Sequence, residues 1–259
     1  MITFDAPGGP LIVPPLSPNG IRLSLVVPTL NEGENIAAFL RAVRDQLEPV
    51  AAGRYEIIVI DDDSPDRTWE IAASLASEIP ALRVVRRRTE KALSAAVIRG
   101  WQTATGEILG TINADFQHPP AVLPALLEQM NRADLAIASR FAEGGGLGDW
   151  AAHRRLNSRI AHTLGRVLLP HAFRRTSDPL SGCYLVRRDA ISGVELHPLG
   201  FKTLMEILVR GRIRTIGECS YEMRARKMGR SKLRARHWFD FFFHLLRLRR
   251  AAGDGSPAQ

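Results

Sequence analysis

The sequence predicts an α/β fold in which a mostly parallel, Rossmann-like sheet is flanked by helices. Two observations predict this fold: short apolar runs alternate with segments of helical periodicity, and polar residues follow several of the apolar runs. Strands joined by helices of roughly 10–15 residues are typical of doubly wound parallel sheets. The chain has 259 residues and is 45% hydrophobic, which is sufficient for one well-packed core.

The first half of the chain predicts five strands, because each of the following segments is short, apolar and of strand length. They are residues 23–27, 56–60, 82–85, 107–112 and 135–138. The segments between them carry apolar residues at helical spacing, and the last of these opens with paired prolines. The predicted helices are residues 34–47, 68–77, 92–105 and 119–130.

The second half of the chain is more irregular. We expect a flexible Gly-rich loop, a basic helix, a short strand, a helix, an extended segment and a final amphipathic helix. These are residues 143–148, 152–169, 184–186, 201–210, 214–218 and 234–250. Residues 1–20 are rich in Pro and Gly and are expected to form a flexible arm, and residues 251–259 to form a disordered tail. Residues 21–233 are therefore predicted to form the main domain.

The composition suggests an anionic partner, because the formal net charge is +8. The positive charge would complement a nucleotide, a phosphorylated lipid, a membrane surface or a nucleic acid. Two cysteines, Cys183 and Cys219, do not make a disulfide framework, so we expect a reducing compartment. The N-terminus lacks a signal-peptide pattern, and no window reaches the roughly 18 apolar residues needed to span a bilayer. We therefore expect a cytoplasmic or peripheral protein.

Polar segments follow four of the predicted strands. They are Pro28–Glu32, Asp61–Pro65, Asn113–Gln117 and Ser139–Phe141. The carboxyl ends of parallel strands form one edge, where open α/β sheets bind ligands, so we expect a nucleotide-binding rim. Carboxylate and amide oxygens near residue 115 suit a hard divalent cation on a diphosphate. No dinucleotide fingerprint and no P-loop motif occurs, which argues against those enzyme classes.

Seven strings, taken in order, resemble the inverting family 2 glycosyltransferases of GT-A fold, and within them the dolichol-phosphate (polyprenol-phosphate) mannose synthase group. The strings are Pro28–Glu32, Asp61–Thr68, Asn113–Pro120, Ser139–Phe141, Arg154–Ala161, Asp178–Gly182 and Arg226–Leu233. The resemblance covers about residues 22–235. It implies metal-assisted transfer of mannose from GDP-mannose to a polyprenyl phosphate, with inversion.

The resemblance also implies a set of site residues. The nucleotide-sugar-binding residues would be Pro28, Leu30, Glu32, Val59, Asp61, Asn113, Ala114, Asp115, Arg140, Arg226 and Lys232. The catalytic residues among them would be Asp115, Arg140, Arg226 and Lys232. The acceptor phosphate would meet Arg140, Arg154 and Ser158, and Mg²⁺ or Mn²⁺ would be held by Asn113, Asp115 and Gln117. Asp178 is predicted either to brace its loop or to touch substrate.

Three positions depart from the family pattern. Asn113 stands where the family has Asp, so a neutral amide replaces a charged metal ligand and should lower metal affinity. Leu30 replaces a Tyr that could stack on the base. Residues 91–95 replace a Gly-Leu-Gly turn. These departures leave two alternatives open: a different nucleotide sugar or phosphorylated acceptor, and a weakly active or inactive homologue that acts as a binding subunit.

The aromatic segment 238–246, followed by three arginines, is too short to span a bilayer but suits a membrane interface. The alternative is a helix packed on its own domain or on a partner. A polyprenyl acceptor favours the cytoplasmic face of a membrane, with or without a separate membrane-anchoring subunit. Nucleic acid is not expected as a partner, because no aromatic and basic platform accompanies the charge.

Overall fold

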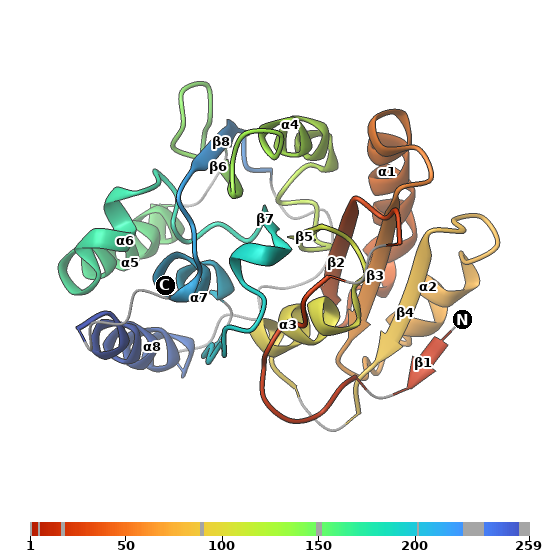
Figure 1. The fold of residues 1–259 in the computed structure, drawn as a ribbon, viewed down its shortest axis with the longest axis horizontal. Coiled ribbons are helices and arrows are strands. Elements are labelled where there is room, and N and C mark those ends of the chain that lie inside the picture. The colour runs from red at the N-terminus through yellow and green to blue at the C-terminus, as the bar shows by residue number, and fades with distance from the viewer. Residues whose placement is uncertain are drawn as a thin grey trace.

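The computed structural model describes residues 2–4, 6–16, 19–88, 91–148, 152–200, 202–224 and 236–253, without the side chains of residues 2–4, 152–154, 236 and 237. One eight-stranded sheet runs through the molecule in the order β1-β4-β3-β2-β5-β7-β6-β8 (Figure 1). The strands are β1 (Ile2–Phe4), β2 (Leu23–Thr29), β3 (Tyr55–Asp61), β4 (Leu82–Arg86), β5 (Ile108–Thr111), β6 (Leu135–Ser139), β7 (Tyr184–Arg187) and β8 (Ile216–Ser220).

Helices cover both faces of the sheet. The α-helices are α1 (Gly33–Ala51), α2 (Thr68–Ser74), α3 (Leu93–Thr103), α4 (Leu123–Gln129), α5 (Ala152–Leu168), α6 (Pro170–Arg174), α7 (Thr203–Arg210) and α8 (Arg236–Gly253). Short 3-10 helices lie at Pro120–Val122 and Arg188–Ala190. The expected α/β fold with a C-terminal helix is confirmed.

Two apolar cores form on the two faces because successive side chains of a strand point to opposite sides. Leu25 and Val27 of β2 pack into the core beneath α1, α2 and α4. Val26 and Ile58, by contrast, pack into the core that α3, α7 and α8 cover. Both faces are therefore buried, which explains why β2 and β3 are apolar without alternation.

Two expectations about the chain ends are corrected, and one strand shows where the mostly parallel sheet departs from parallel. Residues 1–20 were expected to form a flexible arm, but β1 pairs in parallel with β4, and Val13 is fully buried with backbone bonds to residues near 192. Strand β7 runs antiparallel to both β5 and β6, and the other pairings are parallel, so the sheet is mostly parallel as expected. Residues 251–253, placed in a disordered tail, continue α8, while residues 254–259 lie outside the described part of the chain.

The Gly-rich loop 143–148, expected to be flexible, is attached to the segment after β8. Gly146 donates a backbone hydrogen bond to Tyr221 O and accepts one from Met223 N. Gly148 has a φ of +52°, and a Cβ atom there would lie 2.3 Å from Met223 O. Glycine is needed at this position because any side chain would collide with that backbone.

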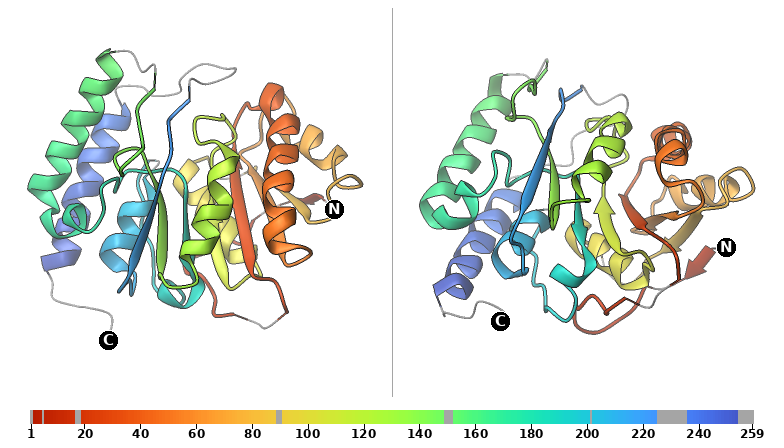
Figure 2. Two further views of the ribbon diagram at one scale, coloured as in Figure 1. Left: turned by 90° about the horizontal axis from the view of Figure 1, so that it is seen from above. Right: turned by 45° about the horizontal axis from the view of Figure 1, so that its top comes forward.

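The C-terminal helix α8 is fixed to α7 by a buried polar contact. His244 Nε2 lies 2.8 Å from Glu206 Oε1, and both side chains are fully buried. Glu206 also accepts hydrogen bonds from Arg210 Nε and the backbone of His197. Burial alone would raise the pKa of Glu206, but these donors outweigh it and the pKa is lowered. Helices α5 and α8 then run side by side at one end of the molecule (Figure 2).

Candidate active site

The carboxyl ends of β2 and β3 are joined by side-chain hydrogen bonds. Asp61 is fully buried at the end of β3. Its carboxylate accepts hydrogen bonds from Thr29 Oγ1 at 2.7 Å, Ser64 N at 2.8 Å and Ser64 Oγ at 2.6 Å. Asp61 therefore braces the loop after β3 from inside. Pro28 and Val59 are also buried, whereas Leu30 and Glu32 are partly exposed.

The next two carboxylates after β3 belong to arginine pairs. Asp62 accepts a hydrogen bond from Arg87 Nε at 2.7 Å, and both side chains are buried. Burial raises the pKa of Asp62, and the Arg87 charge only partly offsets this. Asp63 pairs with Arg86, whose guanidinium carbon lies 4.1 Å from the ring centroid of Trp69. Each of the three consecutive aspartates, Asp61 to Asp63, is thus held by contacts within the protein.

The end of β5 carries the oxygen-rich segment that was predicted to bind metal. Asp115 is nearly buried, and its Oδ1 accepts a hydrogen bond from Gln117 N at 3.1 Å. Phe116 between them has a φ of +58° and packs its ring edge-on against Phe39. This packing stabilises a left-handed backbone that is unfavourable for a bulky residue. Asn113 lies next to Gly182, where a Cβ atom would be 3.0 Å from the Asn113 amide nitrogen.

These residues fit a hard divalent cation that arrives with a diphosphate. They offer one carboxylate and two amide side chains within five residues of one loop. Mg²⁺ commonly binds through one or two carboxylates together with substrate phosphates and waters. Among the described residues no cluster of three His, Cys, Asp or Glu side chains could hold a metal. The donor set therefore depends on the amides and on a ligand's phosphates.

Arg140, at the end of β6, forms a buried ion pair with Asp178. Arg140 Nε and Nη2 donate to the two oxygens of Asp178 at 2.7 Å each. Burial alone would raise the pKa of Asp178, but the hydrogen bonds and charge of Arg140 outweigh it and the pKa is lowered. A two-point contact of this kind fixes the plane of the guanidinium. Of the two roles predicted for Asp178, the structure shows a brace, here one that holds Arg140.

Two histidines border this ion pair and are neutral at pH 7. Burial lowers the pKa of His118 to about 3 and that of His162 to about 4. The His118 ring stacks on Tyr221 with 5.0 Å between centroids, and His162 Nε2 lies 3.9 Å from Asp178 Oδ1. Neither histidine belongs to a ligand pattern in the sequence. Their burial beside Asp178 depends on tertiary packing.

The structure describes only part of the predicted acceptor side. Ser158 lies on α5 and is half-buried. Arg154 is in the first turn of α5, but its side chain is outside the described set, and Arg226 and Lys232 lie outside the described residues. The structure thus brings together the residues at the ends of β2, β3, β5 and β6. The binding and catalytic roles of the predicted site residues remain predictions.

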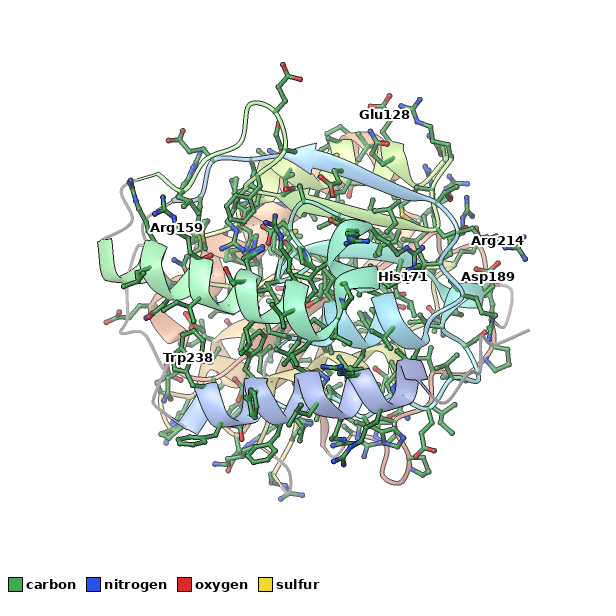
Figure 3. All side chains as sticks on the ribbon, turned by 90° about the vertical axis from the view of Figure 1, so that its left-hand side faces the viewer. Glu128, Arg159, His171, Asp189, Arg214 and Trp238 are labelled. Atoms are coloured by element: carbon green, nitrogen blue, oxygen red, sulfur yellow. The ribbon has the colours of Figure 1, made fainter. Side chains whose placement is uncertain are left out.

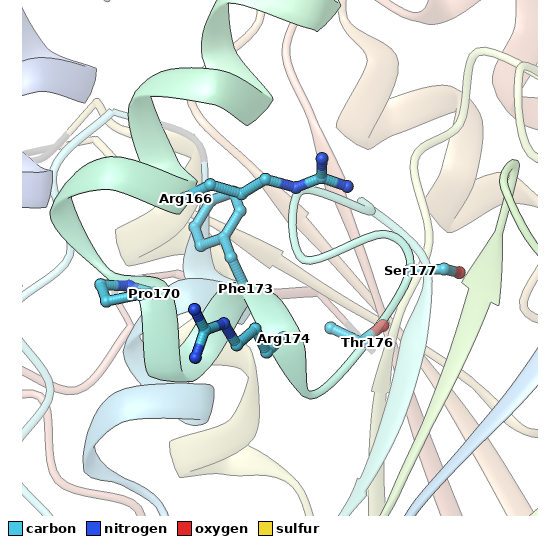
Figure 4. Close-up of a pocket in the computed structure, with 6 residues that line it drawn as sticks. All are labelled: Arg166, Pro170, Phe173, Arg174, Thr176 and Ser177. Carbon is cyan, nitrogen blue, oxygen red and sulfur yellow. The ribbon is translucent and has the colours of Figure 1, made fainter.

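A separate cavity of about 460 Å³ opens beside α5 and α6 (Figure 4). Its lining includes Arg166 and Arg174, whose guanidinium groups point in different directions in Figure 4. Its floor includes Thr176 and Ser177, which hydrogen bond to the Glu218 carboxylate. These groups do not converge on one anion. The cavity adjoins the site through Thr176, whose hydroxyl accepts a hydrogen bond from Asp178 N, and through Phe173, whose ring contacts His162.

The pattern of the family described as glycosyl transferase family 2 matches residues 24–194. The chain belongs to glycosyl transferase family 2. Three curated relatives of this family member are named as mannosyltransferases. A dolichol-phosphate mannosyltransferase of Pyrococcus furiosus is 42% identical over 90% of this chain. One of Saccharomyces cerevisiae is 31% identical over 82%, covering 81% of the yeast protein. An undecaprenyl-phosphate mannosyltransferase of Micrococcus luteus is 30% identical over 82%, covering 88% of that protein.

The family member spans 65% of the length of the Pyrococcus relative. Among solved structures, glucosyl-3-phosphoglycerate synthase of Mycobacterium tuberculosis, in complex with Mn²⁺, UDP and glucosyl-3-phosphoglycerate, matches with a TM-score of 0.66. The two sequences are 20% identical, and the match covers 92% of this chain and 82% of that chain. Another structure of the synthase contains Mg²⁺ and UDP. This likeness confirms the GT-A fold.

Proposed function

We propose that this glycosyltransferase moves mannose from GDP-mannose to a polyprenyl phosphate with inversion at the anomeric carbon. The observation that carries the proposal is the position of Arg140, held by buried Asp178 at the same sheet edge as Asp115. A fixed guanidinium beside an oxygen-rich loop suits a reaction between two phosphate-bearing substrates. The names of the relatives above support this choice of donor and acceptor.

The proposed reaction needs no strong base. A phosphate monoester with a second pKa near 6 is largely a dianion at pH 7, so its oxygen can attack the anomeric carbon directly. As that bond forms, the bond from the anomeric carbon to the GDP oxygen breaks, and GDP leaves with the electron pair. His118 and His162 are poor bases because burial lowers the pKa of each to about 3 and about 4.

The protein residues would then orient the substrates and balance charge. Arg140 would face a substrate phosphate, and Asp178 would keep its guanidinium in place. Asn113, Asp115 and Gln117 would hold Mg²⁺ or Mn²⁺, which when bound neutralises charge on the departing diphosphate. Pro28, Leu30 and Glu32 would lie along the nucleotide, with Val59 and Asp61 supporting that edge from inside the sheet.

We propose further that α5 and α8 together rest on the cytoplasmic face of a membrane, where the lipid acceptor resides. Both helices run along one face of the molecule (Figure 3). Each packs on the domain with one side and exposes apolar residues on the other. The exposed set is Leu156, Ile160 and Val167 of α5 and Trp238, Phe239, Phe242 and Phe243 of α8.

Charge supports the same orientation. Arg155 and Arg159 on α5, and Arg247, Arg249 and Arg250 on α8, are all exposed. Apolar side chains flanked by arginines are typical of helices that lie in a membrane interface. No helix among the described residues is long and apolar enough to cross a membrane. A separate membrane-anchoring subunit is compatible with this surface.

The test is product formation from labelled nucleotide sugars with a short polyprenyl phosphate, in Mg²⁺, Mn²⁺ or EDTA. The proposal predicts a metal-dependent, lipid-linked product from GDP-mannose. A lipid-linked product from a different nucleotide sugar would correct the donor. Donor hydrolysis without lipid product would point to another acceptor. Nucleotide binding without turnover by any donor would favour the binding subunit.

A further inference from the structure

Lys202 lies directly before α7, and its side chain enters the site that holds Arg140. Its ammonium nitrogen donates a hydrogen bond to Leu180 O at 2.5 Å. Leu180 lies two residues after Asp178 in the same loop. Three segments distant in sequence, after β6, before β7 and before α7, thus bring a guanidinium, a carboxylate and an amine together.

The amine of Lys202 is in an environment that opposes its charge. Burial and, to a lesser extent, the charge of Arg140 outweigh the opposite effect of Asp178 and lower the pKa of Lys202 from 10.5 to about 7. Both the ammonium and the neutral amine are therefore populated at neutral pH. A partly buried cation of this kind is stabilised by an anion that enters the site.

Several other titratable groups of the described residues lie around Lys202. His118 and His162 interact with it electrostatically and are neutral at pH 7. Glu206 of α7 already accepts hydrogen bonds from His244 and Arg210. On the side of α8, Asp240 lies beside Gly200, where a Cβ atom would be 3.5 Å from the Asp240 Cβ. Among the described residues, the Asp178 carboxylate acts on Lys202 and is shared with Arg140.

We propose that Lys202 is a further phosphate-binding residue of this site, and that its ammonium group acts with Arg140 on the dianionic acceptor phosphate. The inference rests on the proposed function, since it assumes that the acceptor carries a phosphate monoester. One of the three ammonium donors binds Leu180 O, which holds the group within the electrostatic reach of Arg140 and Asp178. When the dianion binds, Lys202 takes up a proton, so acceptor binding and proton uptake are linked.

The direct test is the protonation of Lys202 with and without a phosphate ligand. The chain has four lysines, Lys91, Lys202, Lys227 and Lys232. Lysine ε-¹³C NMR can therefore be assigned with single Lys→Arg variants, and exposed Lys91 serves as the internal reference. The probe is geranyl phosphate, a short polyprenyl monophosphate. We expect the Lys202 midpoint near pH 7 in the free protein and at least about one pH unit higher with the probe bound, which is tenfold in proton affinity.

The outcomes separate this inference from the proposed function. If geranyl phosphate binds by calorimetry but leaves the Lys202 midpoint unchanged, the inference is wrong and the proposed acceptor stands. If neither geranyl phosphate nor a longer polyprenyl phosphate binds, the proposed acceptor itself is wrong. If geranyl phosphate raises the Lys202 midpoint but inorganic phosphate does not, the inference is supported and the lipid chain is needed to place the phosphate in the site.

Kinetics provide a second test that a purely structural role would not satisfy. We expect Lys202→Met to raise the acceptor KM about tenfold at pH 6.5, with little change in the donor KM. In the native protein the acceptor KM should rise between pH 6.5 and 8.5. Lys202→Arg keeps the positive charge at every working pH, so its acceptor KM should stay constant over that range. Arg54→Met, at the exposed opposite edge before β3, removes a cation and should change neither KM. If Lys202→Met raised the donor KM and the acceptor KM equally and also lowered the Tm, the inference would be overturned.

Discussion

Replacing Asp178 by Asn tests the buried ion pair at the centre of the site. The change keeps the volume but removes the charge opposite Arg140. Both side chains are almost inaccessible, with exposed fractions of 7% for Arg140 and 0% for Asp178. Two hydrogen bonds of 2.7 Å join them. Removing one partner of a buried pair costs about 3–5 kcal/mol, since the remaining charge is left without compensation. An Asn oxygen can still accept one bond, which favours the lower end of that range.

The assay is urea unfolding at pH 7, followed by circular dichroism and tryptophan fluorescence. The lowered pKa of Asp178 means that its contribution is complete above the unfolded value of about 4 and is lost only as the pH falls through the folded value. The matched control is Asp45→Asn, the same chemical change at an Asp that pairs with Arg44 but is 59% exposed. We expect no measurable change there. A loss below about 1 kcal/mol for Asp178→Asn would refute the role given to this pair.

Three further predictions concern the metal loop, the C-terminal helix and the buried histidines. Asn113→Asp should raise Mn²⁺ affinity in the presence of GDP by about tenfold, measured by calorimetry, because it adds a charged ligand; unchanged affinity would remove residue 113 from the ligand set. His244→Ala should destabilise the protein by about 1–3 kcal/mol and speed amide exchange in α8, because Glu206 would lose a buried donor; unchanged exchange in α8 would contradict the attachment. Stability should fall as the pH drops from about 6.5 towards 4, because the folded pKa of His162 is about 4 and the unfolded chain binds protons first. His162→Gln should reduce that slope without abolishing it, because buried His118, with a pKa of about 3, contributes as well; an unchanged slope would show that His162 does not contribute.

The parallel part of the sheet could be predicted from sequence because burial on both faces leaves a direct pattern. Strands β2 and β3 are buried at every position, so their apolar runs are continuous. The direction of β7 could not be predicted, because a short apolar run does not state which neighbours it pairs with. Strand β1 was missed for a similar reason: three residues beside a Pro-rich segment form a strand only through pairing with β4.

The site could be predicted where residues form local strings at strand ends. Residues 113–117 and the pair at 139–140 lie at the expected edge. Asp61 shows the limit of this reasoning, because its buried oxygens are used by Thr29 and Ser64. The spacing of Asp61 and Ser64 is a turn-capping signal that could have indicated this brace. Lys202 was missed entirely, because a single lysine before a helix has no pattern until the fold places it beside Asp178.

The most direct test of the account is the structure of the product that the protein makes from GDP-mannose and a short polyprenyl phosphate. The reaction would be run with Mg²⁺ under single-turnover conditions and followed by ³¹P and ¹H NMR. We predict a mannosyl phosphodiester whose anomeric configuration is opposite to that of the donor, formed together with GDP. A product with retained configuration, or GDP and free mannose without any phosphodiester, would contradict it.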